Sequence, residues 1–113
     1  MYITYTLAVE KAFALKNAYH LPPVTSAAVV KSLMHFGVEK QGNLQIKFVN
    51  DVFLNGKKLC GVLSRIESQG DAFKLVVGVG VNLNTLPGHY PDLNTATSVL
   101  IETGRRISIF EFT

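Results

Sequence analysis

The sequence predicts an α+β domain with a mixed, mostly antiparallel sheet and helices packed on one of its faces. Three observations support this fold class. Residues 2–9 alternate with a period of two, residues 21–36 carry apolar side chains at helical spacing, and strand-like segments joined by turn sequences follow from residue 44. The order of strand, helix and hairpin-linked strands differs from the strand–helix alternation of a parallel sheet.

The N-terminal third should form one strand and one long helix. Residues 2–9 are rich in aromatic and β-branched side chains, and residues 10–20 fit either a short helical turn or a connection. Pro22 and Pro23 suit the first turn of a helix, where an N–H has no partner within the helix. We expect that helix to end at Gly37.

The rest of the chain should be strands, followed by short helices. Asn55-Gly56 indicates a type I′ hairpin. We expect strands at 59–67 and 73–83, joined by a turn at 68–71, and then a surface loop at 85–94. Residues 95–102 fit a short helix capped by Thr95 or Thr97 and stopped by Gly104, and Ser108 fits the cap of another.

Composition limits the classes of function. The chain has 113 residues, of which 48% are hydrophobic and 17% charged, which suits one packed domain or part of one. A net charge of +3 suits an anionic substrate better than a nucleic acid. Cys60 is the only cysteine and is expected to be a small buried apolar residue. With no signal peptide or membrane-spanning run, a cytoplasmic location is expected.

One face of the 73–83 strand loses its side chains at Gly78 and Gly80 and ends in Asn82. A turn at 68–71 would place Gly61 opposite Gly78, so that three glycines form a flat floor on which a planar ligand could lie. The alternative is a β-bulge or a tight crossing by a helix. If Lys58 serves the same ligand as Gly61, the strand must contain a bulge between them, because an odd spacing otherwise sends them to opposite faces.

A second cluster lies at the start of the Asn55-Gly56 hairpin, which should bring Lys57 and Lys58 back toward Asn50-Asp51. Ammonium groups beside a carboxylate and an amide could bind phosphate, and the carboxylate could help to hold Mg²⁺. The alternative is a solvated turn with a surface ion pair. His20, His35 and His89 are too scattered to predict a metal site, and no dinucleotide-binding fingerprint is present.

Four segments in order resemble the catalytic domain of biotin–protein ligases. The family pattern is Lys-Trp-Pro-Asn-Asp, an apolar hairpin arm, Lys-apolar-small-Gly-Ile-Leu, then Gly-x-Gly-Ile-Asn and Ala-Thr-Ser-Leu. The matching residues are Lys47-Phe48-Val49-Asn50-Asp51, Lys58-Leu59-Cys60-Gly61-Val62-Leu63, Gly78-Val79-Gly80-Val81-Asn82 and Ala96-Thr97-Ser98-Val99. The resemblance covers nearly the whole chain and implies a fold like that of class II aminoacyl-tRNA synthetases and biotin–lipoate ligases.

The resemblance implies a two-step reaction. Biotin and ATP form biotinyl-5′-AMP, and biotin then passes to a lysine of a biotin carboxyl carrier domain. The resemblance also implies that Lys58 is the catalytic residue, in contact with both the biotin carboxylate and the phosphate. The other implied contacts are Gly61, Val62 and Gly78 for biotin, Lys47, Asn50, Asp51 and Asn82 for ATP, and Asp51 for Mg²⁺.

The chain departs from the family pattern in two ways. Phe48-Val49 replaces Trp-Pro, which removes a rigid proline before Asn50. Residues 1–113 also contain neither the family's glycine- and arginine-rich loop nor its C-terminal small β-domain, so we expect a partial catalytic domain with little or no activity alone.

A lipoate ligase-like acyltransferase and a non-catalytic paralogue that binds biotin or nucleotide stay open as alternatives. A homodimer is also left open, and neither a membrane nor a nucleic acid is an expected partner.

Overall fold

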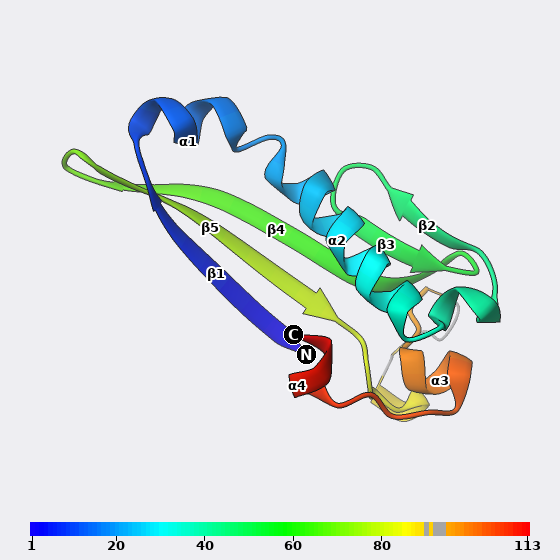
Figure 1. Cartoon of the computed structure of the whole chain (residues 1–113). Coiled ribbons are helices and arrows are strands. Elements are labelled where there is room, and N and C mark those ends of the chain that lie inside the picture. The colour runs from blue at the N-terminus through cyan, green and yellow to red at the C-terminus, as the bar shows by residue number, and fades with distance from the viewer. Residues whose placement is uncertain (90, 92–94) are drawn as a thin grey trace.

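The computed structural model describes residues 1–89, 91 and 95–113. Within these residues the strands form one five-stranded antiparallel sheet in the order β1-β5-β4-β3-β2 (Figure 1). The strands are β1 (Tyr2–Val9), β2 (Leu44–Lys47), β3 (Asp51–Leu54), β4 (Lys57–Gln69) and β5 (Ala72–Val81). With its helices, this sheet confirms the predicted α+β class.

The helices follow the expected order, although the helix predicted over 95–102 begins only at Val99. α1 (Lys11–Asn17) and α2 (Leu21–His35) lie between β1 and β2, and α3 (Val99–Thr103) and α4 (Ile109–Phe112) follow β5. Short 3₁₀ turns occupy Val38–Gln41 and Pro87–His89. α2 carries prolines in its first turn and ends before Gly37, whose φ of 74° is left-handed. Among the described helices, none combines the length and apolar character needed to cross a bilayer.

The core lies between α2 and one face of the central strands. Val62 of β4 and Val79 of β5 belong to the same buried cluster as Val29 and Leu33 of α2. Side chains alternate along a strand, so Gly61, next to Val62, belongs to the opposite face. α1 and α2 cover the core face of the sheet, whereas the β4–β5 hairpin extends beyond α2 (Figure 1).

The register between β4 and β5 differs from the prediction. Gly61 lies opposite Gly80, and Gly78 lies opposite Leu63. The expected turn at 68–71 is wrong because both strands continue to a two-residue turn at Gly70 and Asp71, where Gly70 has a φ of 59°. The pairing shifts by two residues, an even number, so the glycines stay on the predicted face.

The C-terminal segments also correct details of the prediction. α3 is capped by Ser98, whose Oγ accepts a hydrogen bond from the Ile101 N–H at 3.1 Å, and not by Thr95 or Thr97. Ser108 precedes α4 as predicted, but its side chain makes no capping bond. Gly104 stops α3 with a φ of 70°. Residues 90 and 92–94 of the predicted 85–94 loop lie outside the described residues.

Candidate functional site

A pocket of about 430 Å³ lies on the sheet face that carries the glycines. It brings together most of the residues that the sequence singled out. These are Asn50, Asp51, Lys58, Gly61, Val62, Gly78 and Asn82. The volume is in the range that holds a small organic ligand.

The floor of the pocket is backbone. A Cβ built on Gly78 would meet nothing closer than the Leu63 carbonyl oxygen at 3.9 Å, so the space above Gly78 is open. A Cβ on Gly80 would lie 2.9 Å from Cε1 of Tyr2. Tyr2 pairs with Gly80 across β1 and β5, so its ring covers one end of the floor. The predicted shelf is present, and an aromatic ring bounds it at Gly80.

The predicted bulge is confirmed. Val52 of β3 pairs with Cys60, but the next residue, Phe53, pairs with Lys58, so Leu59 is an extra residue on β4. The extra residue reverses the alternation between Lys58 and Gly61. A Cβ on Gly61 would lie 3.5 Å from the Lys58 Nζ, which shows that the ammonium lies directly over this glycine.

Lys58 and Asp51 form the charged centre of the site. Nζ of Lys58 donates to Oδ2 of Asp51 at 2.8 Å, with 47% of the lysine side chain and 23% of the aspartate side chain exposed. Asp51 lies opposite Gly61 on the neighbouring strand, so the carboxylate reaches the ammonium across the floor. Partial exposure leaves the ammonium accessible to an anionic ligand, and the carboxylate fixes its position.

The two predicted amide side chains also hold the strands together. Nδ2 of Asn50 donates to the Val62 carbonyl at 2.8 Å, and the Val62 N–H donates to the Asn50 carbonyl at 2.8 Å. Nδ2 of Asn82 donates to the Thr97 carbonyl at 3.1 Å. Both side chains line the pocket while extending the backbone pairing around it. No local sequence pattern indicates this structural role.

Two lysines predicted near the phosphate site lie outside the pocket. Lys47 pairs with Asp51 from the edge strand β2, but its ammonium lies 5.4 Å from the centre of the Phe53 ring and does not line the pocket. Lys57 pairs with the buried Leu54 and does not line it either. Of the two hairpin lysines, the one that lines the pocket is Lys58, because the neighbours Lys57 and Lys58 point to opposite faces of the sheet.

Cys60 borders the pocket but is 2% exposed and belongs to the core, as predicted. Burial raises the pKa of its thiol to about 12, the nearby Asp51 carboxylate adds to the rise, and the Lys58 ammonium opposes it. The thiol is therefore neutral near pH 7, and a neutral thiol is a poor nucleophile. Its contribution to the site is packing beneath the bulge.

The sequence analysis gave no site role to six residues that line the pocket, namely Tyr2, Ile3, Thr4, Leu63, Val79 and Ala96. Tyr2 and Thr4 share one face of β1, and they pair with Gly80 and Gly78. The period-two pattern did identify that face. It could not identify the partner strand, because pairing between strands 70 residues apart leaves no local signal.

No group of three or more His, Cys, Asp or Glu side chains in the described part of the chain is arranged to hold an ion. Mg²⁺ commonly uses only one or two protein carboxylates and takes its other ligands from phosphates and water. Asp51, at the edge of the pocket, fits that smaller role.

Known proteins share this sequence and fold. The bifunctional ligase/repressor BirA of Bacillus subtilis (strain 168) is 33% identical over 107 residues, which are 90% of this chain and 31% of that protein. The biotin–[acetyl-CoA-carboxylase] ligase of Paracoccus denitrificans is 40% identical over 73 residues, 61% of this chain and 30% of that protein. The chain thus spans less than a third of the length of these two relatives.

The fold matches solved structures of the biotin protein ligase of Aquifex aeolicus. Its apo form superposes with a TM-score of 0.74 at 26% identity, covering 98% of this chain and 47% of that one. A mutant of the same ligase in complex with biotin gives a TM-score of 0.73 at 27% identity, covering 98% and 44%. The sequence profile of the biotin/lipoate A/B protein ligase family matches residues 2–82. Because this match covers well over half of the chain, the chain belongs to the biotin/lipoate A/B protein ligase family, as the sequence predicted.

Proposed function

We propose that this chain contributes the biotin- and ATP-binding centre of a biotin–protein ligase. The observation that carries the proposal is the Lys58 ammonium, which lies over Gly61 beside Asp51 on an open glycine floor. The proposal is also supported by relatives named as biotin ligases and by the similar ligase solved with biotin.

The bicyclic ring of biotin would lie on the floor formed by Gly61 and Gly78, with the backbone of Val62 at its side. A flat ring needs close approach to the backbone, which only glycine allows on this face. The carboxylate of biotin would then reach Lys58. A charge-assisted hydrogen bond there would orient the carboxylate toward the nucleotide.

Lys58 is the proposed catalytic residue. In the first step the biotin carboxylate attacks the α-phosphorus of ATP, the mixed anhydride biotinyl-5′-AMP forms, and pyrophosphate leaves. Both reactants are anions, so the barrier falls when a fixed cation holds them together and stabilises the charge that develops on the phosphoryl oxygens. The ion pair with Asp51 holds the ammonium in place before either substrate arrives.

Asn50, Asp51 and Asn82 border the pocket near Lys58 and are the proposed nucleotide contacts. Lys47 would act on the phosphates from the neighbouring strand, at longer range than the sequence suggested. Asp51 is the proposed ligand for Mg²⁺, which would neutralise phosphate charge. That role requires Asp51 to serve the ion and Lys58 together.

In the second step a lysine of a biotin carboxyl carrier domain would attack the anhydride, form an amide with biotin and release AMP. The biotin–[acetyl-CoA-carboxylase] ligase relative supports a carrier of this kind. We further propose that the 113 residues alone catalyse either step slowly or not at all. By resemblance, a glycine- and arginine-rich loop that is not among these residues holds much of the adenylate.

Calorimetry tests the proposal with biotin, lipoate and ATP as separate titrants. We expect the chain to bind biotin and ATP and not lipoate. Binding of lipoate in preference to biotin would instead favour the lipoate ligase-like alternative. Absence of binding for both biotin and ATP would reject the assignment.

Incubation with biotin, ATP, Mg²⁺ and a carrier domain then measures turnover through pyrophosphate release and biotin on the carrier. Slow or absent transfer is the expected result for these residues alone. Fast transfer would contradict the expected dependence on a loop outside these 113 residues. Binding with no turnover, even after such a loop is supplied in the same polypeptide, would favour the non-catalytic paralogue.

A further inference from the structure

A short segment, Thr95–Ser98, runs beside the bulge that places Lys58. Ala96 forms a parallel bridge with Lys58, whereas β5 pairs with β4 only from Cys60 onward. The Lys58 N–H donates to the Thr95 carbonyl at 2.9 Å, and the Thr97 N–H donates to the Lys58 carbonyl at 3.0 Å. The segment therefore supplies the backbone partners that β5 does not supply at this position.

The same segment also holds Asn82. The Thr97 carbonyl accepts from Nδ2 of Asn82 at 3.1 Å, and the Asn82 carbonyl accepts from the Val99 N–H at 2.9 Å. The Asn82 N–H in turn donates to the carbonyl of Leu59, the extra residue of the bulge, at 2.9 Å. Through its N–H and its carbonyl, Thr97 thus links the two proposed ligand-binding residues, Lys58 and Asn82.

The side chain of Thr97 anchors this link to α3. Thr97 is 1% exposed, and its Oγ1 donates to the Glu102 carboxylate at 2.5 Å. Such charge-assisted bonds are among the strongest that a neutral hydroxyl makes. Ser98 caps α3 and donates to the Thr85 carbonyl at 2.7 Å, which fixes the start of the helix to the preceding loop.

We propose that Thr97 and Glu102 are positioning residues for Lys58 and Asn82. The partly buried bond between them fixes the Thr97 backbone to α3, and that backbone holds the bulge in the form that turns Lys58 toward Gly61. Neither side chain lines the pocket, so both act through residues that do. The inference rests on the proposed function only in so far as the ligands are biotin and ATP.

The test compares Thr97→Val, which keeps the shape but removes the hydroxyl, with Thr97→Ser, which keeps the hydroxyl. Thr103→Val is the control, because the Thr103 hydroxyl donates to the Val99 carbonyl at 2.7 Å and accepts from the Arg105 N–H at 3.1 Å, and neither bond involves Thr97, Lys58 or Asn82. We expect Thr97→Val to weaken the binding of biotin and ATP about tenfold, the equivalent of one hydrogen bond to a charged group. Thr97→Ser should recover most of that loss, and Thr103→Val should leave both affinities unchanged.

Amide hydrogen exchange separates positioning from general destabilisation. Thr97→Val should speed exchange at the Lys58 and Thr97 amides by about tenfold or more and leave the amide of Val79, which β1 and β4 flank on both sides, unchanged. Equal acceleration at Val79 would show a merely structural role and overturn the inference. So would unchanged exchange at Lys58, or Thr97→Ser behaving like Thr97→Val. If the parent chain binds neither ligand, the proposed function fails while exchange at Lys58 still decides the inference.

Discussion

The two faces of the β4–β5 pair share one backbone but differ in their surroundings: one is packed against α2, and the other is open to a ligand. On the helix side, Val62, Val77 and Val79 are buried in a cluster with α2. On the other side, Gly61 lies under the Lys58 ammonium, Gly78 is open, and Gly80 lies under the Tyr2 ring. Stability is concentrated on one face and ligand access on the other, so substitutions on the two faces should change different measured quantities.

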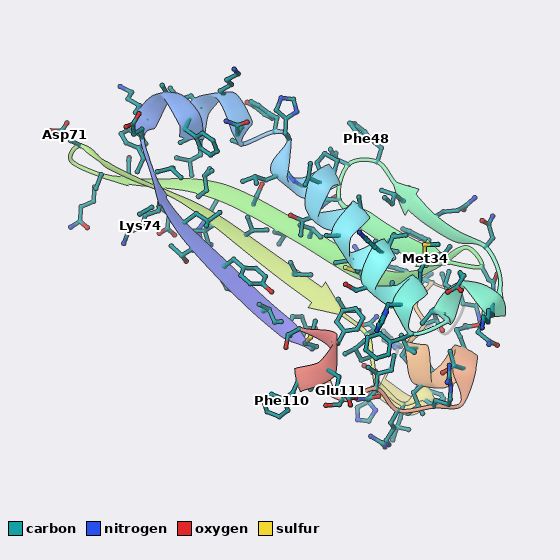
Figure 2. The ribbon with its side chains drawn as sticks, viewed as in Figure 1. Met34, Phe48, Asp71, Lys74, Phe110 and Glu111 are labelled. Atoms are coloured by element: carbon teal, nitrogen blue, oxygen red, sulfur yellow. The ribbon has the colours of Figure 1, made fainter. Side chains whose placement is uncertain are left out.

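Exposed aromatic side chains extend this contrast beyond the sheet. Phe48, in the turn between β2 and β3, and Phe110, in α4, both point away from the body of the chain (Figure 2). They are 84% and 92% exposed, so they add little to the core. The peptide bond between Phe48 and Val49 is cis, at the position where the family pattern has Trp-Pro.

The largest expected effect is on the helix face. Leu33→Ala removes a fully buried side chain of α2 and should lower the free energy of unfolding by about 2–5 kcal/mol. Biotin affinity of the folded fraction should stay unchanged, because Leu33 does not line the pocket. Urea unfolding and calorimetry measure the two quantities. A large loss of affinity in the folded protein would show that the faces are not independent.

The complementary change is on the open face. Lys58→Ala should weaken biotin binding by about 10- to 100-fold, as expected for loss of a charged hydrogen bond. Stability should change by no more than about 1 kcal/mol, because the Asp51 pair is partly exposed. Lys47→Ala is the matched control on the same face, and we expect a smaller effect from it. Equal losses from both variants would contradict the central role given to Lys58.

The pH dependence of stability tests how fully Cys60, which lies between the core and the pocket, is buried. The pKa of this thiol is raised from 9.0 to about 12 in the folded chain, so the folded state retains the proton where the unfolded state loses it. The protonated thiol therefore makes its full contribution to the free energy of unfolding below pH 9. That contribution falls by roughly 1.4 kcal/mol per pH unit as the pH rises from 9 toward 12. Urea unfolding of the parent chain and of Cys60→Ala between pH 8 and 10.5 should show a steeper decline for the parent. Parallel curves would mean that the thiol is not desolvated.

The smallest expected effect on stability comes from Gly78→Ala. The new methyl group has room, with its nearest neighbour at 3.9 Å, and it restricts the unfolded chain, so stability should rise by about 0.4–1 kcal/mol. The same methyl group stands on the proposed biotin floor and should weaken biotin binding. Thermal unfolding measures the expected gain in stability, and calorimetry measures the expected loss of biotin affinity. Unchanged affinity would place the ligand elsewhere in the pocket.

The sequence determined much of this protein by local patterns. The period-two strands, the proline-led α2, the Asn55-Gly56 turn and the glycine face all follow from local sequence. The bulge between Lys58 and Gly61 was predicted on the condition that both residues serve one ligand. The motifs at 47–63, 78–82 and 96–99 identified the family, because several residues in fixed order carry more information than any one of them.

Only the tertiary structure decided which strands are neighbours and which polar groups are already in use. The turn at Gly70–Asp71 moved the register by two residues, the β1–β5 pairing brought Tyr2 over Gly80, and the bulge placed Lys58 on the same face as Gly61. The Thr97–Glu102 bond that supports the site joins two residues whose spacing alone indicates no contact with Lys58. Side-chain periodicity is a property of one strand, whereas pairing and hydrogen-bond partners depend on the free energy of the whole fold.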